Sequence, residues 1–216
     1  TDHIVVMNQE DEIIANDNGL CLGKIYKIDG MGVDFSKKKI EASNPSYPPR
    51  KLVYVGELSE RKNQIFLVKA LRLLPNISLT LVGDGGERKR IEKCAKKYHL
   101  EERLHITGFT KNVGECLKNA DTYVSASKIE GLPFNIVEAM ASGLNIVASD
   151  IKGQRDVLPK ECLFSLESEE DFVSLVKNPY KCQFDTAKFS LDNVLNKNIQ
   201  IYYECAQVQK HLAENL

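Results

Sequence analysis

Two carboxylates stand on either side of a point where a strand is expected to give way to a helix. Glu130 and Glu138 are separated by seven residues, among them Gly131 and Pro133. A helix that begins near Phe134 leaves unpaired amide N–H groups in its first turn, and these groups together with the helix dipole favour a phosphate. The two carboxylates can accept hydrogen bonds from hydroxyl groups. The segment therefore has the chemistry to bind a phosphorylated ligand that is rich in hydroxyls.

The spacing alone leaves a second interpretation open. Glu130 could be a solvated loop acid, and Glu138 could lie in the first turn of the helix and be stabilised by its dipole. Neither residue would then contact a ligand.

Alternating strand and helix patterns define the scaffold that positions this segment. From Lys51 onward, short β-branched runs alternate with amphipathic stretches, which predicts an α/β fold: a Rossmann-like three-layer α/β/α sandwich around a parallel sheet. The expected strands are 51–55, 77–82, 104–107, 122–125, 145–148 and 162–164. The expected helices are 62–74, 87–99, 113–119, 135–142 and 169–177. Ligands are then expected at the carboxyl ends of the strands, where the strand-to-helix loops gather.

The two ends of the chain differ from this central region. We interpret residues 1–49 as a lead-in from the end of a preceding domain plus a linker, because one strand-helix-strand unit is followed by the proline-rich stretch 44–49. Residues 50–184 form the predicted Rossmann-like domain. Residues 185–216 read as a helix with an apolar stripe that packs across this domain or toward the preceding one.

Composition excludes several classes of function. The net charge is -1, with 29 basic and 30 acidic side chains, so no overall field attracts nucleic acid. The apolar runs are far shorter than the ~20 residues of a membrane span, and we expect a cytoplasmic protein. The six cysteines are scattered without metal-ligand spacing, so no metal site is expected.

The basic stretch 87–97 has two interpretations. Its lysines can form an ordinary solvated helix face, or they can contact an anionic membrane surface. The second interpretation would place the protein at the inner face of the membrane as a peripheral protein.

The segment from Glu130 to Gly143 resembles the acid-x7-acid motif of the family 4 (group 1) retaining glycosyltransferases of GT-B fold. The stretches 53–64, 81–85, 106–110 and 120–127 are similar to other loops of that family. The resemblance extends from about Lys51 to Leu158 and is greatest to bacterial exopolysaccharide and capsule enzymes. Residues 1–8 and 30–34 look like the end of the family's amino-terminal domain and its linker. The chain is thereby identified as one half of a GT-B enzyme, the carboxyl-terminal, donor-binding half.

The resemblance implies a role for each matching residue. Lys62 and Arg61 would be catalytic through neutralisation of the donor diphosphate, and Glu130 through binding of the transferred sugar's hydroxyls. Glu138 would bind the ribose hydroxyls. The remaining donor-binding positions are the glycines and the loop and helix residues Gly56, Gly131, Leu132, Phe134, Asn135, Gly108, Phe109 and Thr110.

The implied reaction is hexose transfer from a nucleotide diphosphate sugar to a hydroxyl with retention of configuration. UDP-sugars are favoured over GDP-sugars, no metal or other cofactor is expected, and catalysis would come from cations and helix amides that stabilise the departing diphosphate. The acceptor would be a sugar or a lipid-linked glycan bound by the missing amino-terminal domain. The fragment alone is therefore expected to be inactive.

One position departs from the family pattern. Many relatives carry arginine directly after the glycine that ends the first strand of the domain, whereas Gly56 is followed here by Glu57. Arg61 could take over that role, Glu57 could point away, or donor affinity could be low. We favour substitution by Arg61.

Parts of the sequence are compatible with two other classes of function. Gly83-x-Gly85 after a strand is typical of dinucleotide-binding modules, but the third glycine of that motif would fall at Arg88. A non-catalytic nucleotide-binding or regulatory domain of the same fold is the other alternative.

Overall fold

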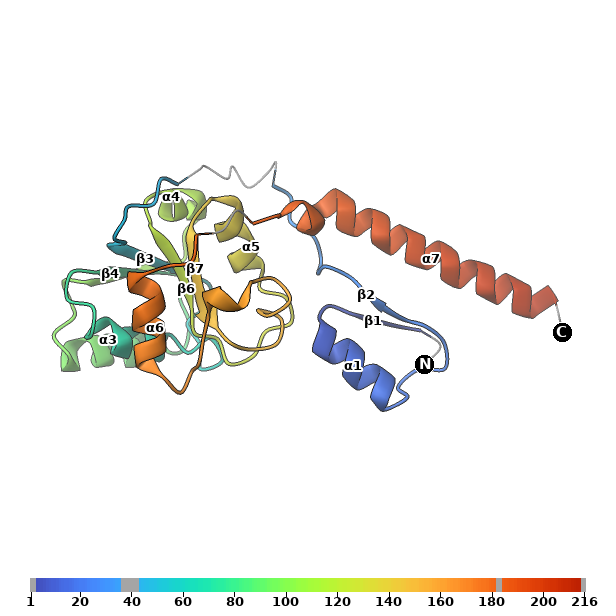
Figure 1. Cartoon of the computed structure of the whole chain (residues 1–216), viewed down its shortest axis with the longest axis horizontal. Coiled ribbons are helices and arrows are strands. Elements are labelled where there is room, and N and C mark those ends of the chain that lie inside the picture. The colour runs from blue at the N-terminus through green and yellow to red at the C-terminus, as the bar shows by residue number, and fades with distance from the viewer. Residues whose placement is uncertain (1–2, 36–42, 182–183, 215–216) are drawn as a thin grey trace. The chain divides into compact units, whose positions relative to one another are not determined.

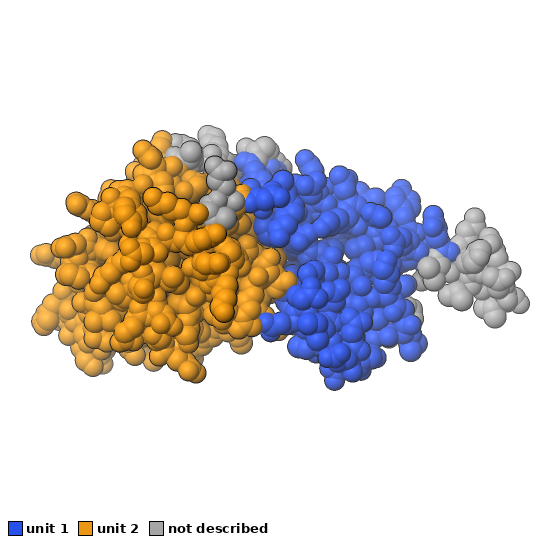
Figure 2. Space-filling view, in the orientation of Figure 1, with its two compact units in different colours: residues 1–37, 185–216 blue, residues 38–184 orange. Residues whose placement is uncertain are grey.

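The computed structural model describes residues 3–35, 43–181 and 184–214, which fall into two compact units. The larger unit spans residues 38–184, and the smaller one combines residues 1–37 with 185–216 (Figure 2). None of the described helices is both long enough and apolar enough to cross a bilayer.

The larger unit is built on a six-stranded parallel sheet. Its strands are β3 (Lys51–Val55), β4 (Ser78–Val82), β5 (Leu104–Gly108), β6 (Thr122–Ser125), β7 (Asn145–Ser149) and β8 (Leu163–Phe164). They lie in the order β5-β4-β3-β6-β7-β8, and each pair is parallel. The chain winds outward in one direction from β3 and in the other from β6. The β3/β6 pair is therefore the topological switch point, where loops diverge and leave room for a ligand.

Helices cover both faces of this sheet. They are α2 (Gln64–Leu71), α3 (Arg88–Lys97), α4 (Val113–Lys118), α5 (Phe134–Ala141) and α6 (Glu169–Lys177). On one face α2 contacts both α3 and α6, whereas α4 and α5 lie on the other face against β3, β6 and β7 (Figure 1). The predicted three-layer α/β/α sandwich with a parallel sheet is confirmed.

The core explains why the strands are apolar on both faces. All four residues of β6 are buried, as are Leu52, Val53 and Tyr54 of β3, which is the pattern of parallel strands between two helical layers. Under α2 and α6, the rings of Phe66, Phe164 and Phe172 pack with centroids 5.1 to 5.8 Å apart. These contacts fix the sheet that carries the loops.

Asp121 attaches the preceding segment to the sheet. Its buried carboxylate, at the start of β6, accepts hydrogen bonds from the backbone N–H groups of Ser46, Arg50 and Lys51 at 2.7 to 2.8 Å. Burial by itself raises the pKa of Asp121, but these hydrogen bonds to the charged form outweigh it and hold the pKa below its ordinary value. The carboxylate thus fixes where β3 begins.

The smaller unit has its own short sheet. Strands β1 (Ile4–Val6) and β2 (Ile25–Lys27) are parallel and joined through α1 (Gln9–Asp17), whose first turn is capped by the Asn8 side chain. The long helix α7 (Leu191–Glu214) follows the 3₁₀ turn η2 (Ala187–Phe189). Backbone hydrogen bonds connect Val33 with Phe189 and Leu191, so the start of α7 is attached to the turn-rich segment near residue 33.

Candidate functional site

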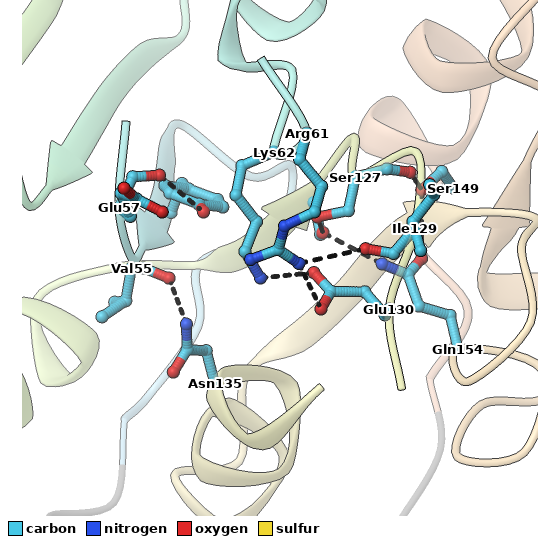
Figure 3. A network of polar contacts seen from close by, with 12 residues as sticks. Val55, Glu57, Arg61, Lys62, Ser127, Ile129, Glu130, Asn135, Ser149 and Gln154 are labelled. Atoms are coloured by element: carbon cyan, nitrogen blue, oxygen red, sulfur yellow. Dashed lines mark hydrogen bonds and ion pairs between the residues drawn. The ribbon is translucent and has the colours of Figure 1, made fainter. Parts of the chain in front are cut away.

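The loops after β3 and β6 meet at the switch point of the sheet. The Lys128 amide donates to the Arg61 carbonyl at 2.9 Å, which joins the two loops. Lys62 Nζ lies 2.5 Å from Glu130 Oε1. Arg61 donates to Glu130 Oε2 at 3.4 Å and to the carbonyl of Ile129 at 3.2 Å (Figure 3). The structure therefore brings together all three residues that the sequence predicted to be catalytic.

The Glu130 carboxylate is withdrawn from solvent. Its side chain is 8% exposed, that of Lys62 is 14% exposed and that of Arg61 is 48% exposed. A buried carboxylate is costly unless it is paired and hydrogen-bonded, and the two cations supply that pairing. The interpretation of Glu130 as a solvated loop acid is therefore wrong. Because an ammonium group carries three N–H donors, Lys62 can hold Glu130 and still donate to a ligand.

The local backbone explains why Lys62 points into the loop junction. A helix was expected from Lys62, but α2 begins at Gln64, since Asn63 adopts a left-handed conformation with φ of 54°. Lys62 thus lies in the turn before the helix. Gln64, which is fully buried, donates to the Glu57 carbonyl at 2.7 Å and ties the loop to the helix start.

A pocket of about 170 Å³ opens beside this ion pair. Side chains from β3, β6 and the start of α5 surround it. Its lining residues are Tyr54, Lys62, Tyr123, Ser125, Ser127, Glu130, Leu132, Pro133, Phe134, Asn135 and Ile136. The pocket therefore joins a cation, a carboxylate and hydroxyl groups at the amino-terminal end of a helix.

The first turn of α5 is open toward this pocket. Pro133 occupies the N-cap position, where no side chain caps the helix. The Phe134 amide donates to the Leu132 carbonyl at 3.1 Å. Of the three amides expected to meet a ligand, that of Phe134 is thus already engaged within the turn.

Two buried tyrosines, Tyr54 and Tyr123, which the sequence reasoning missed, also line this pocket. Tyr123 Oη donates to the Val55 carbonyl at 3.2 Å, and Tyr54 Oη lies 3.4 Å from the Glu57 carbonyl. Burial raises the pKa of both tyrosines; the charge of Glu130 raises that of Tyr54 further, and the neighbouring Tyr54 that of Tyr123. Both phenols therefore remain protonated donors in neutral solution. Tyr54, Tyr123 and Ser125 looked like ordinary strand residues, and only the adjacency of β3 and β6 brings them to one pocket.

Gly56 is required where β3 ends. Its φ is 146°, and a Cβ there would lie 2.7 Å from Tyr54 Oη and 3.1 Å from Asn135 Nδ2. Asn135 Nδ2 donates to the Val55 carbonyl at 2.6 Å, so α5 is anchored directly to the end of β3 (Figure 3). A side chain at position 56 would displace this contact.

A second, more apolar pocket of about 310 Å³ lies on the other side of the β3 end. Its lining residues are Val55, Gly56, Glu57, Val82, Gly83, Asp84, Phe109, Thr110 and Val113. The Phe109 side chain is 87% exposed. Gly108 does not line the pocket but forms a bridge with Gly83 at its margin. Of the expected donor-binding residues, Gly56, Phe109 and Thr110 thus line this second pocket, and Gly108 lies at its margin.

Glu138 and Gly131 lie in neither lining. Glu138 occupies the second turn of α5 and is 6% exposed, so its interpretation as a first-turn acid is wrong. The carbonyl of Gly131 packs against Gly153, where an added Cβ would approach it to 2.3 Å. Glu57 is exposed, and its backbone carbonyl rather than its carboxylate receives the hydrogen bonds from Tyr54 and Gln64.

The glycines that suggested dinucleotide binding have a packing role. A Cβ at Gly83 would lie 2.0 Å from the Gly56 carbonyl oxygen, and one at Gly85 would lie 2.3 Å from the Leu58 carbonyl oxygen. Close approach of the two loops after β3 and β4 accounts for both positions. Within the part of the chain that the structure describes, no three His, Cys, Asp or Glu side chains are grouped so that they could hold a metal.

Comparison with known proteins assigns the family. The model of the family described as glycosyl transferases group 1 matches residues 36–180. The chain is 29% identical to the putative glycosyltransferase EpsD of Bacillus subtilis over 73% of its length, and 26% identical to the amylovoran biosynthesis glycosyltransferase AmsD of Erwinia amylovora over 69%. It spans 45% and 43% of those relatives.

The fold matches solved structures as well. The Anabaena protein Alr3699/HepE, crystallised with UDP, superposes with a TM-score of 0.77 at 18% identity, over 94% of this chain and 64% of that one. The α/β unit described above is therefore one half of a GT-B fold. Since the family match covers the switch-point loops and both pockets, the chain belongs to the group 1 glycosyl transferases.

Proposed function

We propose that this chain is the donor-binding part of a retaining, metal-independent glycosyltransferase that transfers a hexose from a nucleotide diphosphate sugar to a hydroxyl acceptor. The observation that carries the proposal is the contact of Lys62 and Arg61 with the buried Glu130 carboxylate at the start of α5. Two cations and a helix amino terminus form a site for a diphosphate. The carboxylate beside them suits the hydroxyls of a sugar.

The diphosphate and the sugar occupy the smaller pocket in this proposal. Lys62 donates to the diphosphate through the N–H groups that Glu130 does not use, and the exposed Arg61 guanidinium adds a planar pair of donors. The amides of Leu132 and Asn135 complete the phosphate contacts. Glu130 accepts from the sugar hydroxyls.

The nucleoside occupies the second pocket. Gly56 lets the ligand pass close to the end of β3, and Gly108, Phe109 and Thr110 lie beside the base. An exposed aromatic ring such as Phe109 can stack on a base and release water from both faces. Glu138 binds the ribose hydroxyls from α5. UDP is the favoured nucleotide, which is supported by the UDP bound to the Anabaena protein of the same fold.

Catalysis in this proposal is electrostatic. Lys62, Arg61 and the helix amides stabilise the charge that grows on the departing diphosphate. Arg61 supplies the charge that an arginine after Gly56 provides in many relatives, while Glu57 is exposed and lines the second pocket. We assign Glu130 to positioning rather than to nucleophilic attack, because a carboxylate nucleophile would imply a two-step covalent mechanism that the resemblance to the family does not support.

The acceptor belongs to a part of the protein outside this chain. We propose a sugar or lipid-linked glycan as acceptor, in cytoplasmic polysaccharide biosynthesis at the inner face of the membrane. The biosynthetic role in this proposal is supported by the relative named for amylovoran biosynthesis. The chain spans less than half of that relative, so the complete protein is needed for turnover.

Calorimetric titration tests the proposal. UDP, GDP, UDP-glucose, UDP-N-acetylglucosamine and NAD are added to the chain, first without metal and then with magnesium. Metal-independent binding of UDP and of at least one UDP-sugar supports the proposal. Binding of NAD alone would contradict it, and nucleotide binding by a complete protein that transfers no sugar would favour the non-catalytic alternative.

A further inference from the structure

A buried polar cluster lies directly behind the acidic loop, and two of its members, Ser125 and Ser127, also line the smaller pocket. It consists of Ser125, Ser127, Ser149 and Gln154, and each of these side chains is at least 97% buried. Ser125 is the last residue of β6, Ser149 is the last residue of β7, and Gln154 follows in the turn after β7. The cluster therefore joins the carboxyl ends of two strands at the base of the loop that carries Glu130.

The Gln154 amide connects the two strand ends. Its Nε2 donates to Ser125 Oγ at 3.1 Å, and its Oε1 lies 3.2 Å from Ser149 Oγ. Ser149 Oγ donates to the Ser127 carbonyl at 2.6 Å, and Ser127 Oγ lies 3.3 Å from Ser125 Oγ (Figure 3). Every side chain of the cluster has a partner inside it, which is the condition under which a buried polar network rigidifies its surroundings.

Backbone packing adds a second, independent contact with the same loop. Gly153 adopts φ of 78°, and a Cβ there would lie 2.3 Å from the Gly131 carbonyl oxygen and 2.8 Å from that of Glu130. The turn before Gln154 thus supports the backbone of the acidic residue itself. A displacement of this turn moves Glu130 relative to Lys62 and Arg61.

Burial of the Gln154 amide costs desolvation free energy, which points to a role beyond the filling of space. A buried amide without partners loses its hydration, so an apolar residue would be the simpler filling for this position. We propose that Gln154 is a positioning residue for donor binding, which holds the acidic loop so that Glu130 meets Lys62, Arg61 and the sugar hydroxyls at once. This inference rests on the proposed role of Glu130.

The first test measures the loop itself and needs no ligand. The Lys128 amide, which donates to the Arg61 carbonyl, reports the closure of the two loops by hydrogen exchange. In Gln154→Leu its exchange should accelerate about tenfold, because local opening becomes easier. The control is the Leu79 amide, which donates to the Arg103 carbonyl at the far side of the sheet. After correction for any change in global stability, its exchange rate should be the same in the variant as in the wild-type chain.

The second test measures the sugar contribution to donor affinity. In the wild-type chain, UDP-glucose or UDP-N-acetylglucosamine should bind more tightly than UDP, and Gln154→Leu should reduce that ratio about tenfold. In a Glu130→Gln background the same substitution should have no further effect on the ratio. Such coupling is expected only if Gln154 acts through Glu130.

Two further variants separate positioning from simple loss of stability. Val176→Ala removes core volume from α6 on the other side of the sheet, and it should change neither the relative exchange of Lys128 nor the sugar ratio. Ser149→Ala, which removes one hydroxyl of the cluster without lining the pocket, should act in the same direction as Gln154→Leu if that variant does not fold.

The outcomes are distinguishable. If the exchange of Lys128 and the sugar ratio in the cluster variants match those of Val176→Ala, Gln154 is only a core residue and the inference is wrong. If the wild-type chain binds neither UDP nor the UDP-sugars, the proposed function fails, while the exchange measurement still decides whether Gln154 holds the loop.

Discussion

Lys62 Nζ and Glu130 Oε1 lie 2.5 Å apart although the two residues are 68 positions apart in the chain. The contact exists because β3 and β6 are neighbours at the switch point of the sheet. Glu130 pairs with Lys62, and both side chains line the pocket. Donor binding in the proposed site would exchange part of this pairing for contacts with the diphosphate.

Glu130→Gln should therefore affect the sugar and the nucleotide differently. Removal of the carboxylate charge frees Lys62, so affinity for UDP should stay the same or increase. The advantage of UDP-glucose or UDP-N-acetylglucosamine over UDP should fall by about tenfold, the effect of one charge-assisted hydrogen bond. Calorimetric titration with each ligand measures both quantities. An equal loss of affinity for UDP and for the UDP-sugars would show that Glu130 does not contact the sugar.

Gly56→Ala should destabilise the larger unit. The added methyl group would collide with Tyr54 Oη and crowd Asn135 Nδ2 at a backbone conformation that favours glycine. We expect a loss of about 1 to 3 kcal/mol in the free energy of unfolding, measured by denaturant titration. Gly86→Ala is the matched control, because a Cβ at Gly86 meets nothing within 4 Å. Equal stability of the two variants would contradict the close packing at the end of β3.

Asp121 makes the stability of the larger unit depend on pH. Its folded-state pKa is lowered, so its contribution is fully present above the unfolded pKa of about 3.9 and is lost as the pH falls through the lower folded value. Asp121→Asn should reduce the unfolding free energy at pH 7 by about 1.5 to 3 kcal/mol and should flatten its decline between about pH 5 and pH 2. Denaturant titrations at several pH values compare the variant with the wild-type chain. Parallel curves would exclude Asp121 as the titrating group.

Glu138→Ala should weaken binding of the nucleotide rather than binding of the sugar. If Glu138 binds the ribose hydroxyls, affinity for UDP and for UDP-sugars should fall together, by about 1 to 3 kcal/mol. UDP that lacks the 2′- and 3′-hydroxyls provides the control, because its affinity should be low for the wild-type chain and unchanged in the variant. Continued discrimination between the two nucleotides by Glu138→Ala would place the ribose elsewhere.

Much of this arrangement could be predicted from the sequence, and the rest depends on topology. The alternation of apolar runs located all six strands of the large sheet, and the motif located Lys62, Glu130 and the start of α5. Local pattern does not reveal that β3 lies beside β6, so the tyrosines at positions 54 and 123 could not be assigned to a pocket wall. No sequence pattern indicated a role for Gln154, because its burial arises from the packing of that turn against Gly131.

The helix start after β3 shows a local limit of the same kind. Amphipathic periodicity extends back to Lys62, which predicted a helix from that residue. Asn63 instead adopts a left-handed conformation and places Lys62 in the preceding turn. Asparagine tolerates this conformation better than most residues, but periodicity alone cannot tell when it is used.

The central claim is that Lys62 binds the donor diphosphate, and titration of UDP without metal tests it most directly. Four proteins are compared: the wild-type chain, Lys62→Ala, the double variant Lys62→Ala/Glu130→Gln, and Lys128→Ala, the last of which removes a half-exposed lysine from the neighbouring loop. Lys62→Ala should weaken UDP binding by about 1 to 3 kcal/mol. The Lys62→Ala/Glu130→Gln variant, which leaves no unpaired carboxylate, should weaken it by a similar amount. Lys128→Ala should bind as the wild-type chain does. Equal UDP affinity in all of these proteins, or a wild-type chain that binds no UDP, would contradict the account.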